Sequence, residues 1–249
     1  MEPRFGRLYA STVLRPLAEQ LVDALGVRRG ERAVDLLCDG GTLGVALGRA
    51  VGARGTVRLV DTDPGVLEAS MREVAATGCT VATDLADGGS LTLPDASCDR
   101  VASLCTFGFW EGGSLLDVAE RLTDASGSAA VVTWDTASPP LHEVALFGAL
   151  HDLAGVDSDF LKRCLAAPDP ALLRRWEAMP LHDVVRFDGV AQYWAAMVTE
   201  RPVAAELIGQ SAETLQAVRR ACGLALRPWI AADETIRFAV RATLWRLVR

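Results

Sequence analysis

Lysine is almost absent from this 249-residue chain, in which Lys162 is the single lysine beside 24 arginines and three histidines. Lysine and arginine together number 25 against 32 acidic residues, which gives a formal net charge of −7. A nucleic-acid partner needs a basic face that neutralises phosphates, so this acidic balance argues against one. A small-molecule partner is favoured instead.

Long apolar runs and paired cysteines are also missing. No apolar stretch reaches the roughly 18 residues of a membrane span, and MEPRFGRLYA at the start lacks the apolar run of a signal peptide. The six cysteines (38, 79, 98, 105, 164 and 222) form no Cys-x-x-Cys pair, so zinc-ligand spacing is missing and free, mostly buried thiols are expected. We therefore expect a cytoplasmic protein without a metal site, whose oligomeric state stays open.

Half of the residues are hydrophobic, which is enough for one large domain or a domain with a cap. Leucines at helical spacing in VLRPLAEQLVDALG predict an N-terminal helix that stops at Gly26. After it, short apolar segments alternate with helical ones, and strands are expected near 33–37, 56–61, 81–85, 100–105 and 128–134. This alternation predicts an α/β fold with a mostly parallel sheet and helices on both faces.

The rhythm changes after Trp134. A long, mostly helical stretch is expected to about Met179, then a strand over His182–Phe187, further helices to about Leu224 and a last strand near Thr235–Val240. We expect residues 1–137, about 180–190 and 226–249 to form the core, and about 138–179 and 191–225 to form a helical cap that holds substrate. The alternative, in which the later helices only enlarge the core, stays open.

Acidic and glycine residues gather where the strands end. Asp35 lies near the end of the first strand, Gly40 and Gly41 lie in the turn that follows, and Asp61 ends the second strand. Open α/β sheets bind ligands at the carboxyl ends of their strands, and a carboxylate placed like Asp61 can accept two hydrogen bonds from a ribose diol. Any α/β protein also needs turns and helix caps at these places, so a structural role is the competing interpretation.

Four ordered blocks resemble one enzyme family: LRPLAEQLVDALGVRRGERAVDLLCDGG, VRLVDTDPGVLEAS, LTLPDASCDRVASL and GSAAVVTWDTASPP. With the later DPALLRRWEAMPLHDVV, they resemble class I S-adenosylmethionine-dependent methyltransferases, particularly the ubiquinone and menaquinone biosynthesis branch. The resemblance implies a Rossmann-like sheet of seven mostly parallel strands whose last strand is antiparallel. It also implies S-adenosylmethionine as the cofactor, or S-adenosylhomocysteine as the product form.

The cofactor loop departs from the family pattern. The family has an acidic residue followed by three glycines at alternate positions, which here are Asp35, Leu37, Asp39 and Gly41. Leu37 would crowd the methionine moiety, and Asp39 would bring a negative charge towards its carboxylate. We therefore expect weak cofactor affinity that improves when Leu37 and Asp39 are both replaced by glycine.

The other cofactor positions match the family better. Asp61 matches the ribose-binding carboxylate, and Asp87-Gly88 matches the pair that contacts the adenine amino group, with Asp84 as the competing choice. The complete set implied for the cofactor is Asp35, Leu37, Cys38, Asp39, Gly41, Asp61, Thr62, Asp63, Asp87, Gly88 and Cys105.

The substrate side is expected after the fourth and fifth strands. Phe107, Phe109 and Trp110 stand where the family builds the wall between cofactor and substrate, although core packing explains these aromatic residues about as well. His142 is the best-placed candidate for a general base. Tyr9 and Asp135 are further candidates for the substrate pocket.

Two functions remain. The first is methyl transfer from S-adenosylmethionine to a small, apolar or conjugated metabolite. The second is a non-methylating member of the same fold that catalyses an isomerisation or cyclisation in natural-product biosynthesis, or that only binds a ligand. The Asp/Asn-Pro-Pro-Tyr/Phe motif of adenine methylation is absent, so a DNA amino-methyltransferase is disfavoured.

Overall fold

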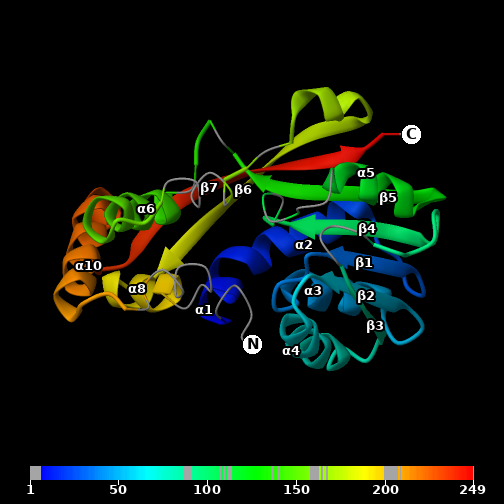
Figure 1. Ribbon diagram of the computed structural model, residues 1–249, viewed down its shortest axis with the longest axis horizontal. Coiled ribbons are helices and arrows are strands. Elements are labelled where there is room, and N and C mark those ends of the chain that lie inside the picture. Colours follow the sequence, from blue (N-terminus) through cyan, green and yellow to red (C-terminus); the bar gives the residue numbers. More distant parts are fainter. Residues whose placement is uncertain are drawn as a thin grey trace.

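The structure is a computed structural model (Figure 1) that describes residues 7–86, 91–106, 108, 110, 114–135, 137–139, 141–157, 163, 165–166, 168–198, 207 and 209–248. Within these residues, no helix is both long enough and apolar enough to span a membrane.

One seven-stranded sheet organises the chain. Its strands are β1 (Arg32–Leu36), β2 (Thr56–Asp61), β3 (Thr80–Leu85), β4 (Cys98–Leu104), β5 (Thr123–Trp134), β6 (Trp176–Phe187) and β7 (Ile236–Leu247), in the spatial order β3-β2-β1-β4-β5-β7-β6. β1 to β5 pair in parallel, and β7 runs antiparallel to both β5 and β6. The predicted fold, with an antiparallel last strand, is confirmed.

Helices connect and flank these strands. They are α1 (Arg7–Tyr9), the π-helical segment η1 (Ala10–Leu14), α2 (Arg15–Leu25), α3 (Thr42–Val51), α4 (Pro64–Ala75), α5 (Leu115–Leu122), α6 (Leu141–Ala154), the 3-10 segment η3 (Pro170–Arg175), α8 (Val190–Val198), α10 (Ala212–Leu226) and the 3-10 segment η4 (Arg227–Trp229). Local chemistry sets their ends. Gly26 ends α2 with a left-handed φ of 60°, and the Asp63 side chain accepts N–H hydrogen bonds from Gly65 and Val66 at the start of α4.

Alternate residues of the central strands serve two apolar cores. Ala33 of β1 packs with α2 and α3 on one face, whereas Val34 and Leu36 pack with α5 on the other. Because the strands are buried on both sides, most of their residues are buried on either face. This is why β1, β2 and β4 could be predicted close to their observed positions.

One predicted segment is wrong. The helical stretch expected to Met179 ends earlier, because β6 begins at Trp176 and pairs with Leu247 of β7 from that residue onward. Residues of β6 alternate between buried and exposed positions, which is the pattern of a strand with one buried face.

The later helices lie together beyond the carboxyl ends of β5 and β6. Figure 1 shows α6, α8 and α10 grouped at that end of the molecule, with the N-terminal helical segment beside them. α10 packs against α6, and α8 contacts α1, α6 and β6. The division into a core and a cap stays a prediction, but these helices border the edge of the sheet where ligands are expected.

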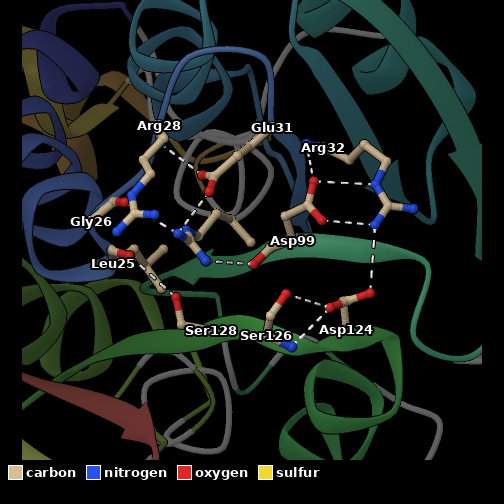
Figure 2. A network of polar contacts seen from close by, with 10 residues as sticks. Leu25, Gly26, Arg28, Glu31, Arg32, Asp99, Asp124, Ser126 and Ser128 are labelled. Atoms are coloured by element: carbon tan, nitrogen blue, oxygen red, sulfur yellow. Dashed lines mark hydrogen bonds and ion pairs between the residues drawn. The ribbon is translucent and has the colours of Figure 1, made fainter.

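The opposite, amino-terminal edge of the sheet carries a network of ion pairs (Figure 2). Arg32, at the start of β1, donates from Nη2 to Asp99 Oδ1 at 2.7 Å and from Nε to Asp99 Oδ2 at 3.2 Å. Arg32 also lies 3.8 Å from Asp124 at the start of β5. Arg100 of β4 donates to Glu31 at 2.8 Å. This network ties together the starts of three strands.

Candidate functional site at the carboxyl ends of the strands

The turn after β1 contains several left-handed residues. Leu37, Asp39, Gly40 and Gly41 have φ values of 58°, 33°, 84° and 80°. Leu37 pays a steric cost of about 1–2 kcal/mol for this backbone, and aspartate tolerates it better. At Gly41 a Cβ would lie 3.2 Å from Ser70 Cα, so the retained glycine is also the one whose surroundings are tight.

Asp61 joins this turn to the end of β2. Its carboxylate is completely buried and accepts the N–H groups of Thr62 at 2.8 Å, Asp63 at 3.2 Å and Asp39 at 3.2 Å. The predicted ribose-binding residue therefore holds two loops in place. All three are backbone hydrogen bonds, so Asp61 acts as a structural acceptor at this edge of the sheet.

Asp35, at the end of β1, is the most perturbed carboxyl at this edge. Its pKa is raised to about 8, mainly by burial and also by the charges of Asp61 and Asp39, while a backbone hydrogen bond from Gly44 opposes the rise. Its Oδ2 has no hydrogen-bond partner among the described residues. Asp35 is thus a buried acid that titrates well above the ordinary carboxyl range.

Two loop residues are enclosed in protein. Leu37 packs into the apolar cluster on the α5 side of the sheet, which also contains Leu36 and Trp110. Burial and the neighbouring carboxylates raise the pKa of the Cys38 thiol well above its ordinary value, so the thiol is unreactive.

A cavity of about 830 Å³ lies beside the turn. Residues 39–42 form one wall, and α1, η1, α2, α3, α4 and Ala195 of α8 contribute the others. Arg7, Arg15, Arg49 and Arg72 line it, whereas Asp35 and Asp61 do not. The open space in the described structure therefore adjoins the predicted cofactor loop without reaching the carboxylate at the end of β2.

A buried polar cluster, formed by Tyr9, His142 and Glu143, lies near the ends of β4 and β5. The Tyr9 hydroxyl donates to Glu143 Oε1 at 2.5 Å and lies 3.3 Å from His142 Nε2. His142 Nε2 is 3.8 Å from Glu143 Oε1. From α8, the Tyr193 hydroxyl donates to the backbone oxygen of His142 at 2.7 Å, which fixes the first turn of α6.

Aromatic rings surround the imidazole of this cluster. The ring of Phe238 stacks on His142 with centroids 5.5 Å apart, and Trp134 and Tyr9 each lie 5.8 Å away. All three cluster residues are at most 1% exposed. The surroundings are therefore apolar, apart from the cluster itself.

Burial sets the protonation of the cluster. It lowers the pKa of His142, so the imidazole is neutral, and it raises the pKa of Glu143, which the Tyr9 hydrogen bond opposes. At the end of β4, burial and the charge of Glu143 raise the pKa of the Cys105 thiol. A carboxyl that titrates above its ordinary range can hold or accept a proton near neutral pH.

The predicted site residues thus fall into separate groups. Tyr9 and His142 lie together, whereas Trp110 lies in the cluster on the α5 side and Asp135 accepts the N–H of Ala137 in the turn after β5. Phe107, Phe109, Asp87 and Gly88 lie outside the described residues. Asp84 forms an ion pair with Arg58, which gives this alternative adenine contact a structural partner.

Glu143 is the functional candidate that sequence reasoning missed. It follows His142 in LHEVALFGAL, where a charged residue stands in an otherwise apolar helix. A carboxylate in such a helix must find a partner or stay protonated, and this pattern could have identified it.

Residues 15–123 match the model of the ubiE/COQ5 methyltransferase family. Among curated proteins, none matches the chain.

Solved structures give the fold over the whole chain. A proposed type II methyltransferase from Anaeromyxobacter dehalogenans is 18% identical, with a TM-score of 0.60 and coverage of 100% of both chains. A proposed methyltransferase from an antibiotic biosynthesis pathway of Anabaena variabilis is 18% identical, with a TM-score of 0.57 and coverage of 94% of this chain and 98% of the other. YcgJ of Bacillus subtilis is 14% identical, with a TM-score of 0.53 and coverage of 94% and 99%. At these identities the likeness shows the Rossmann-like methyltransferase fold.

Proposed function

We propose that this chain, whose residues 15–123 carry the ubiE/COQ5 methyltransferase pattern, transfers a methyl group to a small apolar or conjugated metabolite. The family implies S-adenosylmethionine as cofactor. The observation that carries the proposal is the pair of buried acids at adjacent strand ends, Asp35 on β1 and Asp61 on β2.

The donor set at these strand ends fits that cofactor. Asp35 Oδ2 lacks a hydrogen-bond partner in the described part of the chain, and a buried acid in this state suits the ammonium group of a methionine moiety. Asp61 would accept the ribose hydroxyls. When bound, the cofactor supplies an electrophilic methyl group: the acceptor's lone pair bonds to the methyl carbon while the carbon–sulfur electron pair stays on sulfur, which leaves a neutral thioether.

The Tyr9–His142–Glu143 cluster is the proposed substrate side. It lies at the ends of β4 and β5, and its aromatic neighbours Trp134 and Phe238 provide an apolar wall. Aromatic and apolar walls with a few polar groups are typical of small-molecule sites. Here the chain orients the acceptor, excludes water and accepts a proton.

Calorimetric titration with S-adenosylmethionine and S-adenosylhomocysteine tests the proposal. The natural chain is compared with Asp39→Gly, which keeps the N–H that binds Asp61 but removes a charge, and with the double change Leu37→Gly and Asp39→Gly. Two like charges about 5 Å apart repel by roughly 3 kcal/mol at an effective dielectric of about 20, so Asp39→Gly should strengthen binding by up to about a hundredfold. The double variant tests the crowding by Leu37, at a packing cost of about 2–5 kcal/mol in stability.

Each outcome decides between functions. Weak natural binding that improves in Asp39→Gly supports a methyltransferase with a modified loop. Tight natural binding that neither variant improves supports methyl transfer and shows that Leu37 and Asp39 do not oppose the cofactor. An absence of binding in all three proteins contradicts the proposal.

A non-methylating role is the second candidate. It is favoured by Leu37, whose buried side chain and left-handed backbone stand where the family has glycine. Binding that appears only in the double variant would support it, because the natural loop would then exclude the cofactor. In that case the buried cluster would serve an isomerisation, a cyclisation or ligand binding.

For the cellular location we propose the cytoplasm. Cys38, Cys79, Cys98, Cys105 and Cys222 are buried free thiols, which suits a reducing compartment. Labelling the cysteines after gentle extraction from cells would show reduced thiols if this is right, and disulfide-linked species if it is wrong.

A further inference from the structure

One carboxylate oxygen of the buried Glu143 side chain lacks a hydrogen-bond partner among the described residues. One carboxylate oxygen, Oε1, accepts the Tyr9 hydroxyl, whereas Oε2 has no hydrogen-bond partner among the described residues. His142 Nδ1, on the adjacent residue, also lacks a partner in the described part of the chain. Buried polar atoms are nearly always satisfied in folded proteins, so two neighbouring exceptions indicate a ligand that supplies the missing hydrogen bonds.

No cation pairs with Glu143 in the described part of the chain. Within the described residues, Glu143 forms no ion pair with lysine or arginine, and its basic neighbour His142 is kept neutral by burial. Buried carboxylates are otherwise paired or protonated, since an isolated buried charge is costly. The cluster thus disfavours an anionic ligand and favours one that brings a positive charge.

The rings near the cluster suit the same kind of ligand. Tyr9, Trp134 and Phe238 border His142, and aromatic faces attract ammonium groups as well as apolar bodies. Glu143 also lies close enough to Cys105 at the end of β4 for its charge to act on that thiol. The cluster therefore lies at the strand-end edge where the proposed methyl acceptor would bind.

We propose that Glu143 binds the ammonium group of an amine substrate and accepts its proton, while Tyr9 and His142 hold the carboxylate and the nitrogen in place. This inference rests on the proposed function for the identity of the amine as methyl acceptor. The ammonium N–H bond breaks, its proton moves to the Glu143 carboxylate, and the electron pair stays on nitrogen as the lone pair that methyl transfer requires. Glu143 later releases the proton to water, which restores the carboxylate.

Three ligands with the same body and different charge test the inference: benzylamine, benzyl alcohol and benzoate. Each is titrated into the chain at constant ionic strength and followed by calorimetry, first without cofactor and then with S-adenosylhomocysteine. Benzylamine should bind at least about tenfold more tightly than benzyl alcohol, because a charge-assisted hydrogen bond is worth roughly 1.5–3 kcal/mol. Benzoate should bind most weakly. Equal affinities, or a preference for the alcohol or for benzoate, would overturn the proposal.

Glu143→Gln removes the charge but keeps an oxygen that can accept the Tyr9 hydroxyl. It should abolish the preference for benzylamine, since a neutral amide forms no ion pair with an ammonium group. Glu213→Gln is the matched control. Glu213 lies in the first turn of α10, as Glu143 lies in the first turn of α6, but Glu213 is exposed to solvent whereas Glu143 is buried. The control should bind like the natural chain. A Glu143→Gln protein that still prefers benzylamine would contradict the role of Glu143.

The pH dependence gives a readout that a purely structural role would not produce. From about pH 6 to about pH 8, amine affinity should rise as Glu143 loses its proton, because a benzylamine-like amine stays protonated. The titratable groups around Glu143 are Tyr9, His142 and Cys105, with Tyr193 from α8 and Cys222 from α10 packed on α6. Burial lowers the pKa of His142 and raises those of both thiols, so these three stay neutral. Glu143→Gln should have a flat profile, and an equally steep one would contradict the inference.

A second variant covers the case in which Glu143→Gln does not fold. Tyr9→Phe keeps the ring but removes the hydroxyl that lowers the pKa of Glu143. Its rise in amine affinity should therefore move to higher pH, and an unmoved profile would count against the proposal. The two proposals fail separately: binding of amine without any binding of S-adenosylmethionine contradicts methyl transfer alone, whereas cofactor binding without amine preference contradicts this inference alone.

Discussion

Carboxylates at the two edges of the parallel sheet have opposite surroundings. At the amino ends of the strands, Asp99 receives three hydrogen bonds from Arg32, two from its guanidinium and one from its backbone, and this arrangement lowers the pKa of Asp99 (Figure 2). At the carboxyl ends, Asp35 is buried beside the charges of Asp61 and Asp39, and its pKa is raised to about 8.

This difference in surroundings suggests different roles for the acids at the two edges, stability at the amino edge and ligand binding at the carboxyl edge. Acids at the amino edge are satisfied within the protein and hold the strand starts together. At the carboxyl edge, Asp35 and Glu143 each keep a buried oxygen without a partner among the described residues. Buried carboxyl oxygens without a partner are poorly suited to stabilise the fold and well suited to bind a ligand, although the amino edge also has one unpartnered buried atom, Arg100 Nε.

Asp61→Ala should have the largest effect, since Asp61 is the carboxyl-edge acid that also supports the fold. Three backbone N–H groups would lose their acceptor, and the free energy of unfolding should fall by about 3 kcal/mol or more. Affinity for S-adenosylhomocysteine should also weaken at least about tenfold. Urea unfolding and calorimetry measure the two effects. Asp61→Asn, which keeps one acceptor oxygen, should lie between, and a loss below about 1 kcal/mol in the alanine variant would show that the amides find other acceptors.

Asp35→Asn should act in the opposite direction and stabilise the fold. Between the ordinary carboxyl pKa of about 4 and the folded value of about 8, the folded chain holds a proton that the unfolded chain has released. Stability from this group therefore falls as pH rises through that window, and the asparagine variant should escape the loss. We expect a gain of about 2 kcal/mol at pH near 8 that disappears near pH 4, together with weaker cofactor binding. Urea unfolding of both proteins at a series of pH values measures this difference. An asparagine variant that is less stable than the natural chain at pH near 8 would contradict the prediction.

Asp99→Asn should have the smallest effect on the free energy of unfolding. It should be destabilising, as is usual for the loss of a paired acid. Because the folded pKa of Asp99 is lowered, its contribution is complete above the unfolded pKa and is lost as pH falls through the folded one. The cost should be about 1 kcal/mol at neutral pH, since the side chain is partly exposed to solvent. Urea unfolding at neutral and acid pH measures it. A cost that persists at low pH would mean that the Asp99 charge is not the cause.

The central strands could be predicted because the sequence carries their burial directly. β1, β2 and β4 are largely buried on both faces, and Gly26 and Asp63 mark helix ends by local chemistry. β6 was harder to recognise. Its start at Trp176 depends on pairing with Leu247, the last residue of β7, and local sequence does not encode a partner 71 residues away.

The site was predicted only in part for the same reason. Asp35 and Asp61 follow strands, so their place at the edge could be read from the order of elements. Glu143 becomes a buried acid only because Tyr9, 134 positions earlier, and α8 close over the first turn of α6. The charge in an otherwise apolar helix marks Glu143 as unusual, but the local sequence does not show which distant segments enclose it.

The position of β7 also determines when the molecule can be completed. β7 is the last strand of the chain, yet it lies between β5 and β6 and pairs with both. During synthesis, β5 and β6 therefore leave the ribosome with facing edges that stay unpaired until residues 236–247 arrive. Such late, non-local pairing is slow and leaves strand edges open to wrong partners. A nascent chain of this protein must keep the facing edges of β5 and β6 from wrong partners until the twelve-residue strand β7 is made.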